Sequence, residues 1–304
     1  MGHFGFRYAS LLAVVMTLFI TFVACGSQLY QVSLHGDSGS RQSATQGTSG
    51  GKGGSLMGSG PEGNADPKSA NFGLHAPGGW HSLPIHYRVD YSMPSQQIAQ
   101  IQKAMHTWEV ATGKTLFAFD GLHQGVTGNS FNDLYTSLDD GTNGFYSDEN
   151  WVKTGKPSVV LATTIWDNDT ADPSKILTAD IRYNDAFYVF GDALVIKPLG
   201  SKEVVDLQTV ATHELGHFLG LIHIDAKVDS QSIMVASLYI GQGLTTRALS
   251  AGDISRIQKI YGCSGSACNI EQTQTLIEKM VHEAPPATAG AIAESSTSNK
   301  AATK

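Results

Sequence analysis

Residues 213–223 read HELGHFLGLIH, and this stretch decides both the fold and the chemistry that we expect of the chain. On a helix, side chains four residues apart lie on the same face, so His213 and His217 should point at one spot. Two neutral imidazoles placed in this way suit a tetrahedral Zn²⁺ ion. Glu214 stands beside the first histidine, where it can take a proton from a water molecule at the metal without binding the metal itself.

A third ligand has to come from beyond the helix, because the next residues on the same face lie too far along its axis. Gly220 provides the break, since glycine adopts positive φ angles and can end a helix with a sharp turn. His223 can then return to the ion. Three protein ligands leave the fourth position open for water, which is typical of a catalytic zinc site and not of a structural one.

The other histidines stand alone in the sequence, and a lone histidine is more often an ordinary core or surface residue than a ligand. We apply this interpretation to His75, His81, His86, His106, His123 and His282. The full spacing of residues 213–223 is far more specific than the short HExxH motif, which many proteins carry by chance.

A methionine eleven residues after the third histidine, in the tripeptide SIM, extends the motif. Together they resemble the motif of the metzincin zinc endopeptidases, which implies that Met234 forms the turn beneath the zinc ligands. Within this clan the closest resemblance is to the matrixins, and it covers roughly residues 74–262. It is carried in chain order by LPIHYRVDY (83–91), IAQIQKAMHTWEVATGKTLFAF (98–119), ILTADIRYND (176–185), VDLQTVATHELGHFLGLIH (205–223) and LSAGDISRIQKIYG (249–262).

The resemblance implies an α+β fold of the zincin type, with a mixed twisted sheet, an active-site helix, a Met-turn and a C-terminal helix. It implies a zinc-dependent endopeptidase that cleaves extracytoplasmic proteins, with Glu214 as the general base. It also suggests that a substrate strand lies along a sheet edge near residues 187–196 and that Tyr239 lines the specificity pocket. The chain lacks the PRCGxPD cysteine switch and the histidine- and aspartate-rich loop that holds a second zinc in vertebrate members. We therefore expect one zinc ion and no latency through a propeptide thiol.

Two other functions remain open at this point. In the first, the zinc ion only stabilises a surface lipoprotein that binds other proteins, although a structural site would have no need of Glu214. In the second, the chain is a zinc hydrolase that acts on cell-wall amides. Residues 166–174, WDNDTADPS, are rich in oxygen ligands and leave a calcium site possible, but such a run is more often a solvated turn.

The N-terminal residues have the pattern of an export signal. Residues 11–24 form an apolar run that is shorter than the roughly 20 residues of a membrane span. The run ends in FVACG, which resembles the lipobox of bacterial lipoproteins, and this implies that residues 1–24 are cleaved and that Cys25 carries a lipid. Gly26 favours the outer membrane or the cell surface. An ordinary signal peptide, with a secreted or periplasmic product, is the alternative.

Composition divides the rest of the chain. Residues 25–70 are rich in glycine and serine and predict a flexible tether, and residues 71–262 form the catalytic domain. Residues 263–304 form a C-terminal extension with a possible helix and a disordered tail. We expect a disulfide between Cys263 and Cys268, since one such pair is a weak metal signal in an exported protein. The net charge of −7 and the lack of a basic stretch exclude nucleic-acid binding, and we expect a monomer.

Hydrophobic periodicity predicts the main elements. Strands are expected at 83–91, 115–121, 159–167 and 175–185, and short apolar runs follow at 187–198. Helices are expected at 94–113, from Asp206 through the motif, and at 250–262, where Ser250 and Asp253 form a capping box. Residues 121–157 are rich in turn formers and give no assignment. This order of elements supports an α+β domain around a mixed sheet.

Overall fold

The computed structural model describes residues 30–33 and 66–282. The predictions of a signal peptide at 1–24, of a lipid on Cys25 and of a disordered tail fall outside these residues. Within the described part of the chain, no helix combines the length and the apolar character needed to cross a membrane.

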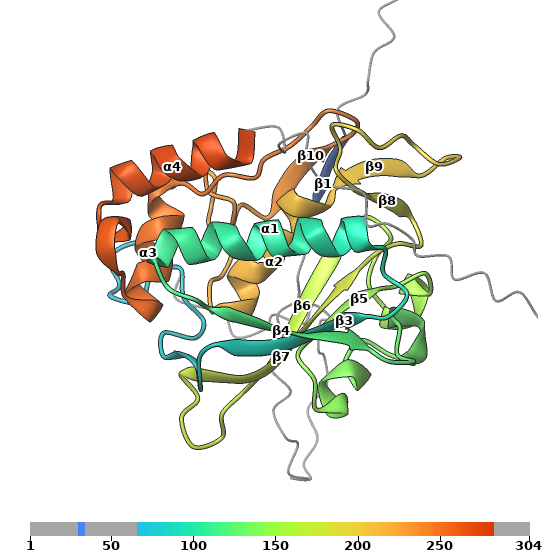
Figure 1. Cartoon of the computed structure of the whole chain (residues 1–304), viewed down its shortest axis with the longest axis horizontal. Coiled ribbons are helices and arrows are strands. Elements are labelled where there is room, and N and C mark those ends of the chain that lie inside the picture. Colours follow the sequence, from blue (N-terminus) through green and yellow to red (C-terminus); the bar gives the residue numbers. More distant parts are fainter. Residues whose placement is uncertain (1–29, 34–65, 283–304) are drawn as a thin grey trace, which may run out of the picture.

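A six-stranded sheet forms one layer of the molecule (Figure 1). Four parallel strands follow one another in the order β4, β3, β5 and β7. The short fifth strand, β2, pairs parallel with the first residues of β7. The sixth strand, β6, lies antiparallel along the other edge of β7, so the sheet is mixed. The bounds of the six strands are β2 Gly79–Trp80, β3 Ile85–Asp90, β4 Phe117–His123, β5 Gly144–Ser147, β6 Ala162–Asn168 and β7 Lys175–Tyr183.

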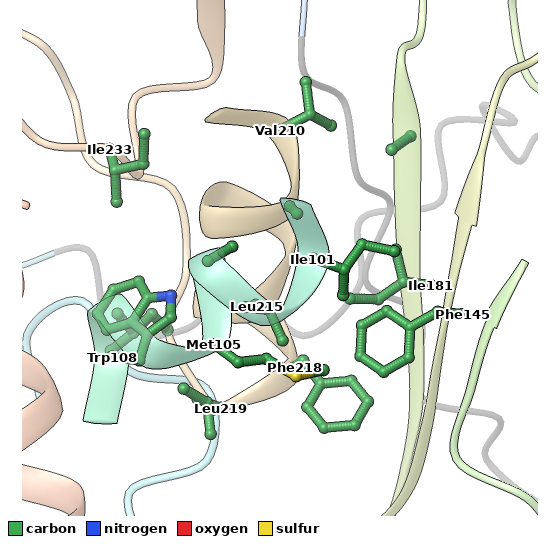
Figure 2. Packing of buried hydrophobic residues seen from close by; sticks show 14 of the residues in the cluster. Ile101, Met105, Trp108, Phe145, Ile181, Val210, Leu215, Phe218, Leu219 and Ile233 are labelled. Atoms are coloured by element: carbon green, nitrogen blue, oxygen red, sulfur yellow. The ribbon is translucent and has the colours of Figure 1, made fainter. Parts of the chain in front are cut away.

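Two helices, α1 (Ser95–Thr112) and α2 (Leu207–Phe218), cover one face of this sheet (Figure 1). Their contact with each other and with the sheet forms the core. The side chains that meet there are Ile101, Met105 and Trp108 from α1, Leu215, Phe218 and Leu219 at the end of α2, and Phe145 and Ile181 from the sheet (Figure 2). Each buried side chain of this size contributes about 1.5–3 kcal/mol, so the core fixes α2 firmly against the sheet.

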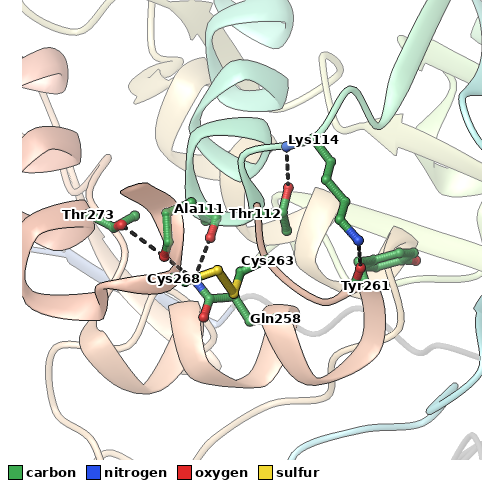
Figure 3. The surroundings of a disulfide bond; sticks show 9 residues. Ala111, Thr112, Lys114, Gln258, Tyr261, Cys263, Cys268 and Thr273 are labelled. Atoms are coloured by element: carbon green, nitrogen blue, oxygen red, sulfur yellow. Dashed lines mark hydrogen bonds between the residues drawn. A yellow bond between two sulfur atoms is a disulfide. The ribbon is translucent and has the colours of Figure 1, made fainter. Parts of the chain in front are cut away.

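The remaining helices pack beside the end of α1. They are α3 (Ala251–Tyr261) and α4 (Ile270–His282), and the chain between them contains a disulfide that joins Cys263 to Cys268. Gln258 of α3 donates to Ala111 O of α1 and to Ala267 O inside the disulfide loop, at 2.7 Å each (Figure 3). The C-terminal extension is therefore attached to the domain along residues 263–282.

Two small sheets lie outside the main one. In the first, β8 (Tyr188–Gly191) runs parallel to β9 (Glu203–Asp206). In the second, β10 (Ser237–Ile240) pairs antiparallel with β1 (Tyr30–Ser33). β1 lies within the stretch 25–70, for which the sequence predicts a flexible tether, and the composition of that stretch gave no sign of the pairing.

Residues 121–157, which had no assignment, contain β5 and three short 3₁₀ helices at Gly128–Ser130, Thr136–Asp140 and Trp151–Thr154. A buried arginine of β7 holds this segment to the sheet. Arg182 donates to Asp148 Oδ2 at 2.5 Å and to Gly128 O at 3.3 Å, and both charged side chains are fully buried. The α+β fold class expected from the sequence is confirmed, and this segment supplies β5, an interior strand of the sheet.

Candidate metal centre

Helix α2 begins where the sequence predicts. Asp206 caps it, since its Oδ2 accepts a bond from Thr209 N at 3.0 Å, and Arg247 binds the same carboxylate. In the middle of the helix, Trp108 Nε1 of α1 donates to Thr212 O at 2.9 Å. These contacts fix the residue before the first histidine of the motif, so α2 presents its histidines from a rigid support.

The three histidines of the motif converge on one point. The Nε2 atoms of His213, His217 and His223 lie 3.1–3.3 Å from one another. Tetrahedral Zn–N bonds of about 2.0–2.1 Å place ligand nitrogens roughly 3.3 Å apart, which matches this triangle. A metal ion could be held by three or more histidine, cysteine or acidic side chains that lie close together. Among the residues that the structure describes, these three histidines form such a group.

The outer nitrogens of two rings define their tautomers. His213 Nδ1 lies 2.7 Å from Ile233 O, and His217 Nδ1 lies 2.9 Å from Leu221 O. A carbonyl oxygen only accepts, so both Nδ1 atoms carry the proton and both Nε2 lone pairs face the centre. Burial lowers the pKa of His213 to about 3 and that of His217 well below its usual value. Neutral imidazoles with converging lone pairs are the form that a cation requires.

Gly220 makes the turn that the sequence predicts for it. Its φ is +109°, and α2 ends just before it at Phe218. A Cβ atom at this position would stand 2.9 Å from Ala76 O, so the site excludes other residues by space as well as by conformation. The turn brings His223 back beside the two histidines of the helix.

Glu214 lies beside the triangle and is fully buried. Thr164 of β6 approaches it, with Oγ1 at 2.6 Å from Glu214 Oε2 and at 3.1 Å from Glu214 O. Burial raises the pKa of Glu214 to about 7, and the Thr164 hydrogen bond opposes that rise. The other carboxylate oxygen, Oε1, is buried and accepts no bond from the described residues. One oxygen is thus held by the protein and the other is available to a ligand.

Met234 packs beneath the histidines. A Cβ atom on Gly216 would stand 2.2 Å from Met234 Sδ, so this glycine of HELGH leaves the space that the thioether fills. Ile224 N, next to the third histidine, donates to Met234 O at 2.9 Å. The chain after His223 is therefore tied to the same methionine that supports α2.

A pocket of about 280 Å³ adjoins the centre. Thr209, one turn before His213 on α2, and Ile233, whose carbonyl binds that histidine, both line it. Tyr239 lies on its wall, as the sequence suggests, and β10 supplies the neighbouring residues.

The remaining candidates make ordinary polar contacts. In the run 166–174, Asp169 contacts His81 at 3.1 Å and Asp172 accepts from Ser174 at 2.6 Å. The calcium site stays a prediction. His86 and His106 are exposed and face acidic neighbours, as ordinary surface histidines do.

Two residues near the centre were missed by sequence reasoning. Thr164 lies on a predicted strand, but the pattern of a strand does not say which helix it packs against. His75, classed as an ordinary histidine, binds His217 O through Nε2 at 2.8 Å. Neither contact leaves a local signal, because each joins residues 50 or more positions apart.

Comparison with known families gives one finding that agrees with this geometry. A family model described as Matrixin matches residues 95–262, which is more than half of the 304 residues of the chain. The matched region contains α2, the three converging histidines, Met234 and the capping box of α3. The chain therefore belongs to the matrixin family.

Proposed function

We propose that the chain is a zinc-dependent endopeptidase that hydrolyses peptide bonds with Glu214 as its general base. Family membership supports the coarser statement that it is a metallopeptidase. The proposal of zinc-dependent peptide hydrolysis with Glu214 as the base rests on one observation. The three histidine Nε2 atoms lie 3.1–3.3 Å apart, and the buried carboxylate of Glu214 lies beside them on α2.

His213, His217 and His223 would hold the zinc ion. When bound there, zinc lowers the pKa of water towards 7 and polarises a peptide carbonyl. Glu214 takes the proton of the attacking water and gives it to the leaving amine. Thr164 holds Oε2, which leaves Oε1 to face the reacting groups.

The substrate strand binds along β6 in this proposal. β6 pairs with β7 on one edge, packs against α2 through Thr164, and within the described residues has no strand on its other edge. β6 is not the edge that the resemblance suggests, which lies near residues 187–196. The strand in that region, β8, pairs with β9 in a separate sheet and does not belong to the main one. A peptide can add to β6 by main-chain hydrogen bonds and place one side chain in the pocket beside Ile233.

The proposal includes an extracytoplasmic location, with the chain anchored by a lipid on Cys25. The apolar run at 11–24 and the small residue before the cysteine support it. The disulfide between Cys263 and Cys268 supports an oxidising compartment. Labelling cells with a radioactive fatty acid tests the anchor, because the native chain should be labelled and a Cys25→Ala chain should not.

The test of function compares the native chain, Glu214→Gln and the control Glu271→Gln, which changes an exposed glutamate of α4. Each is assayed for bound zinc and for cleavage of a mixed peptide library, with and without a chelator. We expect one zinc per chain in all three, and turnover about 10²–10⁴-fold lower in Glu214→Gln alone.

The same assay separates the alternatives. Native chain that binds zinc and cleaves no peptide would support a zinc-stabilised binding protein. Release of fragments from peptidoglycan, with none from peptides, would support a hydrolase of cell-wall amides. Equal turnover in the native and Glu214→Gln chains would contradict the assignment of the base.

A further inference from the structure

The end of α2 is closed by donors from a segment that precedes the matrixin match. A helix leaves its last carbonyl groups without partners of its own, so other groups have to bind them. His75 Nε2 lies 2.8 Å from His217 O, and Trp80 Nε1 donates to Phe218 O at 2.7 Å. Both donors lie upstream of residue 95, where the match begins.

The same segment binds the turn that follows. Gly220 O accepts two backbone hydrogen bonds, from His75 N at 2.9 Å and from Ala76 N at 3.3 Å. In the opposite direction, Ile222 N donates to Gly73 O at 3.0 Å. Residues 73–76 therefore run antiparallel along 220–222, the short connection between the second and third histidines of the centre. The direction in which His223 leaves this connection depends on a segment that contributes no metal ligand.

His75 also joins this connection to the strand proposed to bind substrate. Its ring stacks on Trp166 of β6, with ring centroids 3.9 Å apart and an angle of 23° between the planes. Since His217 O can only accept, Nε2 of His75 carries the proton. Its Nδ1 is buried and has no hydrogen-bond partner among the described residues. The ring is thus held by one donated bond and one stacking contact.

We propose that His75 is a positioning residue for the metal centre. Its Nε2–H holds the last turn of α2, and its backbone N–H holds Gly220, so that His217 and His223 meet the ion in one fixed geometry. His217 O also accepts from Gly220 N at 3.0 Å, so loss of the ring bond leaves the helix end looser without unfolding it. The inference rests on the proposed zinc site but not on peptidase activity.

Two substitutions in the full-length chain distinguish the effect of the hydrogen bond that His75 donates from the effect of its ring stacking. His75→Phe keeps an aromatic ring against Trp166 and removes the donor, whereas His75→Gln keeps a donor and removes the ring. His106→Phe, at an exposed histidine of α1, is the matched control. The measurement is zinc affinity by competition with a chromophoric chelator, together with thermal unfolding of each metal-free chain.

We expect zinc affinity about 10–100-fold lower in His75→Phe, which is the usual effect of losing an outer partner of a ligand. His75→Gln should stay within about threefold of the native chain, as should the control. Native affinity in His75→Phe would overturn the proposal. Equal losses in both His75 variants, with equal loss of metal-free stability, would also overturn it, because the ring would then only fill space.

Failure of the proposed function gives a different result. A native chain that binds zinc tightly but cleaves no peptide would contradict the peptidase assignment and would leave the affinity comparison intact. A native chain that binds no zinc would overturn both.

Discussion

At the scale of single residues, the proposed base is oriented by a neighbour that the motif does not contain. HExxH specifies that a glutamate stands beside a ligand, but it does not fix the direction of the carboxylate. In this chain Thr164 does so from β6, with Oγ1 at 2.6 Å from Glu214 Oε2. The hydroxyl has one proton, and the short distance assigns it to the carboxylate and not to Glu214 O.

Replacing Thr164 by valine, which has a similar shape, should lower kcat. A hydrogen bond to a charged group contributes about 1.5–3 kcal/mol, which corresponds to roughly 10–100-fold in rate if it acts in the transition state. Thr164→Ser keeps the hydroxyl and should retain most of the activity. Steady-state kinetics on a cleaved peptide give the values. In the Glu214→Gln background the valine should cause no further loss, and an equal loss there would show that Thr164 acts elsewhere.

A second prediction concerns Asp180, which lies in the sheet away from the centre. Burial raises its pKa well above the ordinary value, and Asp140 raises it further, while the bond from Gly144 N and the charge of Arg182 oppose the rise. A raised folded pKa favours the protonated form, so this group stabilises the fold below its unfolded pKa, near 4, and that stabilisation is lost as pH rises through the folded pKa.

Asp180→Asn should therefore increase the free energy of unfolding, and the gain should be larger at pH 8 than at pH 5. The amide oxygen can still accept from Gly144 N, which the native Oδ1 binds at 2.7 Å. Urea unfolding at the two pH values measures the effect, with the exposed Glu271→Gln as control. A lower stability of Asp180→Asn at both pH values would show that the carboxylate is ionised and needed.

At the scale of elements, the helices were predictable because their start and stop signals are local. The predicted helix from Pro94 to Gly113 is observed as α1, with Gly113 in the left-handed conformation as its C-cap. The capping box of Ser250 and Asp253 is present at the start of α3. Periodicity and capping act within one element, so the sequence alone carries them.

The short strands were not predictable in the same way. β5 has four residues, GFYS, after a polar turn, yet it lies between β3 and β7 in the sheet. Its place depends on pairing with strands that lie far away in the chain, and four residues are too few to show alternation. The same reason explains why the contacts of His75 and Thr164 were missed while the spacing of the histidine motif was read correctly.

The turn after α2 supplies the prediction at this scale. Gly220→Ala should destabilise the fold by about 1–3 kcal/mol, since φ of +109° is strained for any residue with a Cβ atom. It should also weaken zinc binding, because the new atom would stand 2.9 Å from Ala76 O and push the connection to His223. Unfolding by urea and chelator competition measure the two effects.

The matched control is Gly155→Ala, in the segment 121–157. Gly155 has a φ of +74°, but a Cβ atom there would meet nothing within 4 Å. This change should reduce stability by about 1 kcal/mol and leave zinc affinity unchanged. Equal zinc affinity in the two alanine variants would contradict the role given to the Gly220 turn.

At the scale of the whole molecule, the matrixin match is shorter than the unit that builds the centre. It begins at residue 95, after β3 and after the segment 73–80 that closes the end of α2. β3 pairs with β4 on one side and with β5 on the other, so it is an interior strand of the sheet. A chain without it would expose two unpaired strand edges and part of the core.

We therefore predict that a chain starting at residue 95 neither folds nor binds zinc, whereas one spanning residues 66–282 does both. The longer fragment keeps β3, the donors His75 and Trp80, and helix α4 against the end of α1. Circular dichroism with urea unfolding tests the fold, and chelator competition tests zinc binding. A cooperative unfolding transition in the shorter fragment would show that α1 and the remaining strands make a sufficient core. Native zinc affinity in that fragment would show that the helix end needs no donors from upstream.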